Sequence, residues 1–174
     1  MIPRKLLQSL HTGVRPGRVW MLLGARRVGK TELINHYLDQ LADEKWYRGH
    51  GEDRDLADLL EARSSSRLRQ FLEGYDGLFL DEAQSVAGIG ASLKLLVDLM
   101  PALRVIVTGS SVFHLDQILG QPLTGRRSVH YLHPVSTTEI ADWKDPLSAQ
   151  SLLPDLLNYG SYPELLQIGA PAER

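Results

Sequence analysis

Apolar and polar residues alternate along the chain in blocks that are typical of strands and helices taken in turn. Short apolar runs of strand length occur at residues 19–23, 78–80, 104–107 and 128–132, with a weaker one at 45–50. Helical patterns separate or follow them at residues 3–13, 33–41, 53–73 (broken at 64–66), 86–100, a stretch ending near 119, and 136–168. Strands that alternate with helices predict an α/β fold, a mostly parallel sheet with helices on both faces.

The alternation stops near Pro134, after which only helical patterns remain, with breaks at Pro146, Pro154 and Gly160. The total length of 174 residues is that of one domain with a full core. We therefore predict a core over residues 1–134 and a helical segment over residues 135–174.

Composition narrows the function classes. The chain is 43% hydrophobic and 23% charged, which is typical of a globular protein and argues against disorder. It has no cysteine, which excludes disulfides, thiolate zinc sites and cysteine nucleophiles. The longest apolar run, residues 19–25, is far shorter than the roughly 20 residues of a membrane span. Net charge is −2, yet residues 1–31 hold seven basic residues and no acidic one. An acid-free basic start can mark a targeting peptide, but this one runs directly into a strand and loop that the fold needs. The alternatives are a solvated basic face and contacts to phosphate.

The first motif follows the first predicted strand. Residues 24–31 read GARRVGKT and fit Gly-x4-Gly-Lys-Ser/Thr, a loop whose backbone N–H groups cradle phosphate oxygens. Lys30 is expected at the β- and γ-phosphates, and the Thr31 hydroxyl is expected to ligate Mg²⁺. Two arginines in the loop either neutralise phosphate or point into solvent. The predicted nucleotide-binding residues here are Gly24, Ala25, Arg26, Arg27, Val28, Gly29, Lys30, Thr31 and Glu32.

The second motif is the apolar run 78–80 followed directly by Asp81 and Glu82. A carboxylate at the end of a strand can hold Mg²⁺, which is the role expected of Asp81. The next carboxylate, Glu82, can polarise a water for attack on the γ-phosphate. The alternative is an exposed acidic turn. Placed after a phosphate-binding loop, the pair favours hydrolysis.

The third motif, Thr-Gly-Ser-Ser at residues 108–111, ends the next apolar strand. Parallel strands present their carboxyl ends to one crevice, so a hydroxyl here can report on the γ-phosphate or the attacking water. Ser110 is the candidate for that role. The alternative is that these residues cap a helix, for which Ser111 is suited.

Together these residues resemble the AAA-type ATPase domains of a prokaryotic family that pairs the domain with a nuclease-like C-terminal domain of unknown function. The resemblance rests on GARRVGKT, LFLDEAQ and VIVTGSS, on LTGRRSVHYLHPVSTTEI at residues 123–140, and on YGSYPELL at residues 159–166. It implies a five-stranded parallel sheet in which the strand before the third motif lies between the strands before the other two. It also implies ATP, Mg²⁺ and hydrolysis.

The resemblance extends to two further positions. Arg126 matches an arginine that related proteins offer to a neighbouring subunit's nucleotide, although Arg127 stands beside it and a plain surface role is an alternative. Tyr162 and Pro163 match an element that touches the nucleotide base, the alternative being a helix-breaking turn. The chain departs from the family at Ala25, Ala83 and Ser161. The family's C-terminal domain is also expected to be absent from these 174 residues.

Three functions follow as hypotheses. The first is Mg²⁺-dependent ATP hydrolysis that drives a conformational change. The second is a slow nucleotide-dependent switch with little turnover of its own. The third is a nucleic-acid-dependent motor, since DEAQ at residues 81–84 resembles a helicase signature, although no second motor domain is present. Expected partners are ATP, a C-terminal domain or other protein, copies of the same chain, and, more weakly, DNA. We expect a cytoplasmic location without membrane contact.

Overall fold

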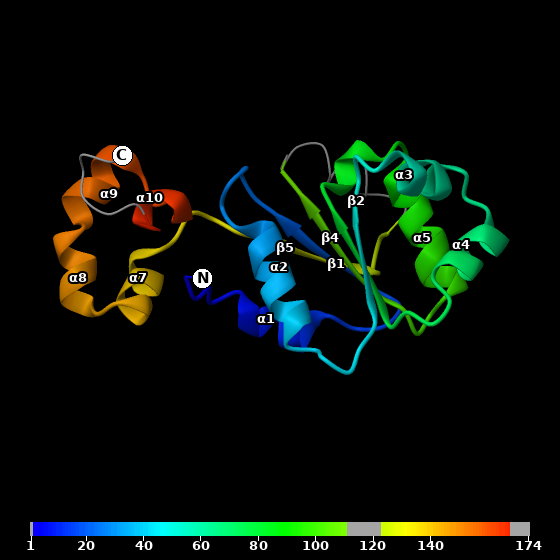
Figure 1. Cartoon of the computed structure of the whole chain (residues 1–174), viewed down its shortest axis with the longest axis horizontal. Helices are drawn as coiled ribbons and strands as arrows, with labels where there is room; N and C mark the ends of the chain where they lie inside the picture. The colour runs from blue at the N-terminus through cyan, green and yellow to red at the C-terminus, as the bar shows by residue number, and fades with distance from the viewer. Residues whose placement is uncertain (1, 111–122, 168–174) are drawn as a thin grey trace.

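A five-stranded parallel sheet forms the centre of the computed structural model, which describes residues 2–110 and 123–167 (Figure 1). The strands lie in the order β2-β3-β4-β1-β5, and each adjacent pair is parallel. The predicted fold class is therefore confirmed, including the position of β4 between β1 and β3. The strands are β1 (Val19–Leu23), β2 (Trp46–His50), β3 (Gly77–Asp81), β4 (Arg104–Gly109) and β5 (Arg127–Tyr131).

The inner strands are continuous apolar runs because both of their faces are covered. Every residue of β1 is buried, and its side chains divide between two clusters. Trp20 and Leu22 belong to one cluster, whereas Val19, Met21 and Leu23 belong to the other. This division follows from the two-residue period of a strand. The edge strands β2 and β5 are only partly buried.

Helices cover both faces of the sheet, as the alternation predicted. Figure 1 shows α1 and α2 on one side and α3, α4 and α5 on the other. The helices of the first side are α1 (Leu7–Gly13) and α2 (Lys30–Asp39). Those of the second side are α3 (Arg54–Glu61), α4 (Ser65–Phe71), the short 3₁₀ helix η1 (Ala83–Ser85) and α5 (Ile89–Leu99). The predicted helix ending near residue 119 and the predicted cap Ser111 lie outside the described residues.

The start of α1 differs from the prediction. Pro3 suggested a helix from residue 3, but the helix begins at Leu7. The preceding residues are held elsewhere, because Ile2 and Arg4 are both buried against parts of the chain far from α1. Burial of these two side chains outweighs the local preference for a helix.

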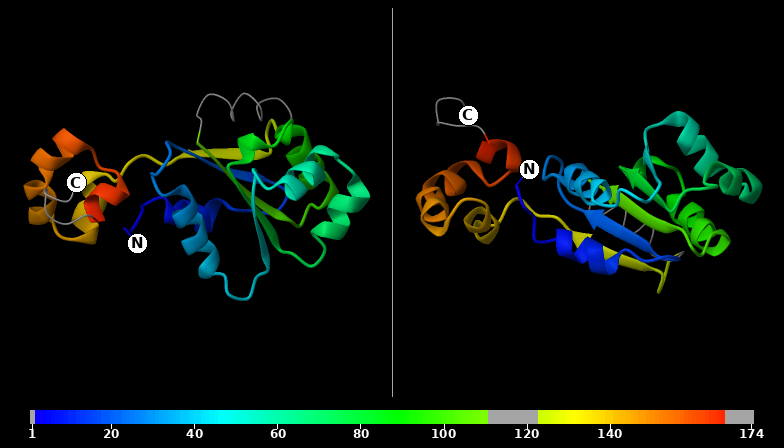
Figure 2. Two further views of the ribbon diagram at one scale, coloured as in Figure 1. Left: turned by 45° about the horizontal axis from the view of Figure 1, so that its top comes forward. Right: turned by 60° about the horizontal axis from the view of Figure 1, so that its bottom comes forward.

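Among the residues described after β5 there are four short helices: α7 (Thr137–Trp143), α8 (Pro146–Ser151), α9 (Leu153–Tyr159) and α10 (Pro163–Gln167). We call residues 135–167 the helical segment. It lies beside the sheet, near the amino terminus, in each view of Figures 1 and 2. Its small core contains Val135, Ile140 and Leu166, together with Ile2 from the other end of the chain. The domain boundaries at residues 134 and 135 stay a prediction. No helix among the described residues is long and apolar enough to cross a membrane.

Candidate nucleotide-binding site

The loop between β1 and α2 is held in one shape by its glycines and by Val28. A Cβ atom on Gly24 would lie 2.3 Å from the carbonyl oxygen of Leu132, so only glycine fits beside the end of β5. Gly29 has φ +92°, a left-handed conformation that glycine adopts without strain. The Val28 side chain is fully buried in the core. The loop thus leaves β1 and enters α2 as a tight, anchored turn.

Lys30 is the first residue of α2, and its side chain folds back into the loop. Its Nζ atom donates hydrogen bonds of 3.0 Å to the carbonyl oxygens of Gly24 and Ala25. Burial lowers the pKa of Lys30, whereas the nearby carboxylates of Glu82 and Asp81 act to raise it. A partly desolvated ammonium inside a loop of this kind is suited to binding phosphate oxygens.

Asp81 is the last residue of β3, and its buried carboxylate accepts several hydrogen bonds. Its Oδ2 atom accepts a 2.6 Å hydrogen bond from the Thr31 hydroxyl. Its Oδ1 atom accepts from the Thr108 hydroxyl and, at 3.2 Å, from the Glu82 backbone N–H. The hydroxyl of Thr31 and the carboxylate of Asp81 are hard oxygen ligands of the type that Mg²⁺ takes, so these residues fit the implied ion.

Glu82 lies in a left-handed turn, with φ 48°, directly after the strand. Its carboxylate accepts a hydrogen bond from the Gln84 side-chain amide, which also donates to Ser110 at 3.2 Å. Burial alone would raise the pKa of Glu82. Hydrogen bonds with Gln84 and Ser110 and the charges of Lys30 and Arg26 outweigh burial, so the pKa is lowered below its ordinary value. Glu82 is therefore an ionised and oriented carboxylate at neutral pH.

Lys30, Thr31 and Glu82 line a cavity of about 660 Å³, within the range of small-molecule sites. The loop, the ends of β2 and β3, the amino-terminal segment and α10 all contribute to its wall. Across it, Arg27 forms a 3.4 Å ion pair with Glu164 of α10. Of the predicted residues, those lining the cavity are Arg26, Arg27, Gly29, Lys30, Thr31, Glu32, Glu82 and Pro163.

Four predicted site residues do not line the cavity and are connected to it through hydrogen bonds. Gly24 and Ala25 hold Lys30, Asp81 holds Thr31, and Ser110 reaches the site through Gln84. The sensing role predicted for Ser110 stays a prediction.

Arg126 does not join this site. It immediately precedes β5, at the amino end of the parallel strands, whereas the cavity lies at their carboxyl ends. Its guanidinium pairs with Asp98 of α5, and its side chain is 49% exposed. Within one chain, this arginine cannot reach the cavity.

Sequence reasoning missed three residues that shape the site. Gln84 and Thr108 stand inside the quoted motifs, so a hydrogen-bonding role could have been inferred from their positions. Arg4 carries no such signal. It lines the cavity and donates a 2.8 Å hydrogen bond to the Val28 carbonyl of the loop.

Comparison with known proteins agrees with this geometry at the level of the fold. Domain III of the Thermotoga maritima replication initiation protein DnaA has 14% identity and a TM-score of 0.55, with 99% of this chain and 91% of that chain covered. AMPPCP-bound DnaA from Aquifex aeolicus has 11% identity and a TM-score of 0.59, covering 97% and 61%. The Drosophila ORC bound to DNA has 13% identity and a TM-score of 0.56, covering 79% and 94%. No curated protein matches the chain.

Identities this low support the fold alone. The sequence profile of the AAA domain matches residues 16–141, which include the phosphate-binding loop, β3 with its two carboxylates, and β5. This match spans most of the chain and all five strands of the sheet. The chain therefore belongs to the AAA domain family.

Proposed function

We propose that this chain binds ATP with Mg²⁺, hydrolyses it, and passes its nucleotide state to the helical segment. The observation that carries the proposal is that Lys30, Thr31 and Glu82 line one cavity, with the Asp81 carboxylate hydrogen-bonded to the Thr31 hydroxyl. A phosphate-binding loop, a cation-binding pair and a second, ionised carboxylate are the parts that hydrolysis of a nucleoside triphosphate needs.

Each part has a defined task in this proposal. The loop amides and the Lys30 ammonium hold the phosphates. Thr31 and Asp81 would hold Mg²⁺, which supplies positive charge beside the phosphates. Glu82 accepts a proton from the attacking water, and Gln84 and Ser110 keep its carboxylate in place. Pro163, which lines the cavity at the start of α10, would touch the nucleotide from the side of the helical segment.

Arg126 enters the proposal only through a second copy of the chain. Arg126 lies at the amino ends of the strands, opposite its own chain's cavity, and its side chain is half exposed. It could therefore meet the nucleotide of a neighbouring subunit. A guanidinium suits that task because it bonds phosphate oxygens in bidentate fashion. The same proposal includes a homo-oligomer, a C-terminal nuclease-like domain as partner, and a cytoplasmic location.

The test measures ATP affinity and phosphate release on the same preparations. Lys30→Ala is expected to abolish ATP binding, with Lys94→Ala, an exposed lysine on α5, as the matched control. Glu82→Gln is expected to retain binding and lose hydrolysis, with the exposed Glu73→Gln as its control. Unchanged affinity in Lys30→Ala would overturn the assignment of the loop.

A slow switch is the second candidate, favoured by the position of Arg126 outside its own chain's site. If a neighbour must supply this arginine, an isolated chain binds ATP tightly and turns it over slowly. Turnover that rises with protein concentration would identify an assembly-dependent ATPase. Turnover that stays negligible at every concentration would identify a switch, and stimulation by added DNA would instead favour a motor.

A further inference from the structure

Arg4 is a buried arginine that joins three separate parts of the molecule. Its side chain is only 5% exposed. Nη1 donates a 2.8 Å hydrogen bond to the Val28 carbonyl in the phosphate-binding loop. Nη2 donates to the carbonyl of His133, just after β5, and Nε donates to Glu139 of α7 at 3.2 Å. One guanidinium therefore connects the loop, the chain leaving the sheet and the helical segment.

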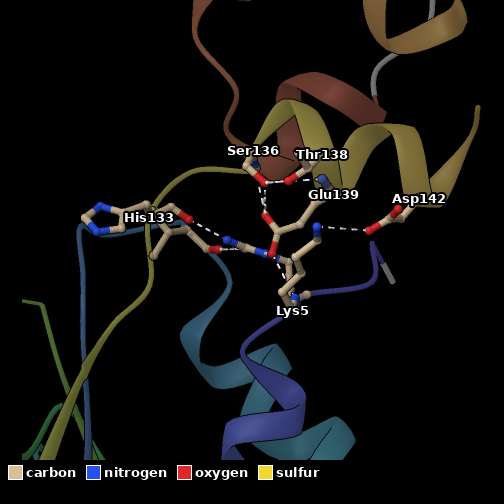
Figure 3. A network of polar contacts seen from close by, with 8 residues as sticks. Lys5, His133, Ser136, Thr138, Glu139 and Asp142 are labelled. Atoms are coloured by element: carbon tan, nitrogen blue, oxygen red, sulfur yellow. Dashed lines mark hydrogen bonds and ion pairs between the residues drawn. The ribbon is translucent and has the colours of Figure 1, made fainter. Parts of the chain in front are cut away.

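Both carboxylate oxygens of Glu139, the partner of Arg4 in α7, accept further hydrogen bonds. Its Oε1 atom also accepts a 2.9 Å hydrogen bond from the backbone N–H of Lys5. Its Oε2 atom accepts from the backbone N–H and the hydroxyl of Ser136, completing the capping box that starts α7 (Figure 3). Burial opposes ionisation, but these hydrogen bonds and the Arg4 charge lower the pKa of Glu139. The carboxylate that begins α7 is thus held in place as an anion.

The contact with Val28 fixes the orientation of the Val28–Gly29 peptide. In a trans peptide the C=O and the N–H point in opposite directions within one plane. The oxygen of the Val28–Gly29 peptide points to Arg4, so the Gly29 N–H points away from it. Gly29 lines the cavity, and N–H groups of such loops are the phosphate ligands. Rotation of this peptide would break the bond to Arg4.

We infer that Arg4 is a positioning residue that orients the Val28–Gly29 peptide for phosphate and, through Glu139, couples occupancy of the loop to the stability of α7. The inference rests on the proposed nucleotide-binding function. A phosphate that binds the Gly29 N–H favours the peptide orientation that Arg4 also favours. Nucleotide then strengthens the Arg4 contacts, and α7 gains protection because its first turn is built around Glu139.

The experiment follows amide hydrogen exchange in the whole chain with and without AMPPCP and Mg²⁺, together with the Kd of AMPPCP. In the wild type, AMPPCP is expected to slow exchange in α7 several-fold. Arg4→Gln is expected to weaken AMPPCP binding about tenfold and to remove the nucleotide-dependent change in α7. Glu139→Gln is expected to retain most of the affinity while reducing the change in α7, because the loop contact of Arg4 survives.

Lys5→Ala is the matched control. Lys5 forms an exposed ion pair with Asp142 beside the same network, and its backbone N–H remains in the variant. It is expected to behave as the wild type. A merely structural role of Arg4 would raise exchange in α7 equally with and without nucleotide, and that outcome would overturn the coupling.

Two further outcomes separate this inference from the proposed function. A wild-type chain that binds no AMPPCP would overturn both. A wild-type chain that binds it, with Arg4→Gln binding equally well and still protecting α7, would overturn the coupling alone. Should Arg4→Gln fail to fold, Arg4→Lys serves instead. It retains the charge but cannot span Val28 and Glu139 together, so an unchanged α7 response there would equally overturn the coupling.

Discussion

The Thr31 hydroxyl donates a 2.6 Å hydrogen bond to Oδ2 of Asp81 and so joins the start of α2 to the end of β3. These two residues are the proposed Mg²⁺ ligands. Their contact means that the ion's ligands are already adjacent, although 50 positions separate them in the chain. Preorganisation of this kind reduces the cost of ordering the site when a ligand binds.

Loss of the Thr31 hydroxyl is expected to weaken binding of ATP only when Mg²⁺ is present. Thr31→Ala should raise the Kd of ATP about 10- to 100-fold with Mg²⁺, the range for a hydrogen bond to a charged group, and change it little in EDTA. Thr31→Ser keeps the hydroxyl and serves as the control. Titration calorimetry in both buffers measures the difference. An equal loss of ATP affinity with Mg²⁺ and in EDTA would mean that Thr31 maintains the conformation of the loop and does not act through the ion.

Gln84 is expected to affect turnover more than binding, because its amide bridges Glu82 and Ser110. Gln84→Ala should lower kcat about 10- to 100-fold through misplacement of Glu82, with the Kd of ATP unchanged. Gln84→Glu should be at least as damaging, because a second carboxylate beside Glu82 opposes its ionisation. Steady-state phosphate release gives both constants. Gln70→Ala, on the exposed surface of α4, is the control, and a normal kcat in Gln84→Ala would remove the residue from the mechanism.

Arg126→Ala is expected to leave ATP affinity unchanged, because the residue lies far from its own chain's cavity. If it serves a neighbouring subunit, the variant should lose the rise of turnover with protein concentration. Mixing it with Lys30→Ala should then restore partial activity, since each chain supplies what the other lacks. If Arg126→Ala turns over ATP like the wild type at all protein concentrations, Arg126 has no role in catalysis and only pairs with Asp98 at the surface.

Stability is expected to fall as pH drops below the ordinary imidazole range. His130 stacks on the buried ring of Trp20, with centroids 4.4 Å apart, and burial lowers its pKa from 6.5. The unfolded chain therefore takes up the proton first, and stability is present above about pH 6.5 and lost as pH falls below it. His130→Phe retains a ring and removes the titration. Urea unfolding at about pH 7.5 and about pH 5.5 should show a smaller pH effect in the variant. Identical pH effects in the wild type and the variant would assign the loss of stability to other titratable groups.

Gly24→Ala is expected to cost more stability than Gly74→Ala. The added Cβ would lie 2.3 Å from the Leu132 carbonyl oxygen, which belongs to the backbone and cannot swing aside. A loss of about 1–3 kcal/mol is the usual result of such overpacking. Gly74→Ala is the comparison, because that glycine has a positive φ but open space around it. A larger loss at Gly74 in thermal unfolding would contradict this ranking.

Local sequence patterns were sufficient to predict the strands of the sheet and the phosphate-binding loop. The strands of the core are short apolar runs flanked by turn residues, and the loop, Asp81 and Glu82 lie in contiguous motifs, so their chemistry could be inferred from neighbours in sequence. The place of β4 between β1 and β3 came instead from the family resemblance. The contacts of Arg4 could not be inferred either way, since Glu139 is 135 positions away. The early start predicted for α1 failed for the same reason, because Ile2 and Arg4 are fixed by distant partners.

Ile2 packs in the core of the helical segment, beside Val135 and Leu166. This pairing has a consequence for the order of events during synthesis. Ile2 stays uncovered during synthesis until Leu166 of α10, far later in the chain, has emerged. Contacts of such long sequence separation form late, so the sheet is expected to assemble before the amino-terminal segment docks. The phosphate-binding loop would then gain its contact with Arg4 only after the sheet has formed.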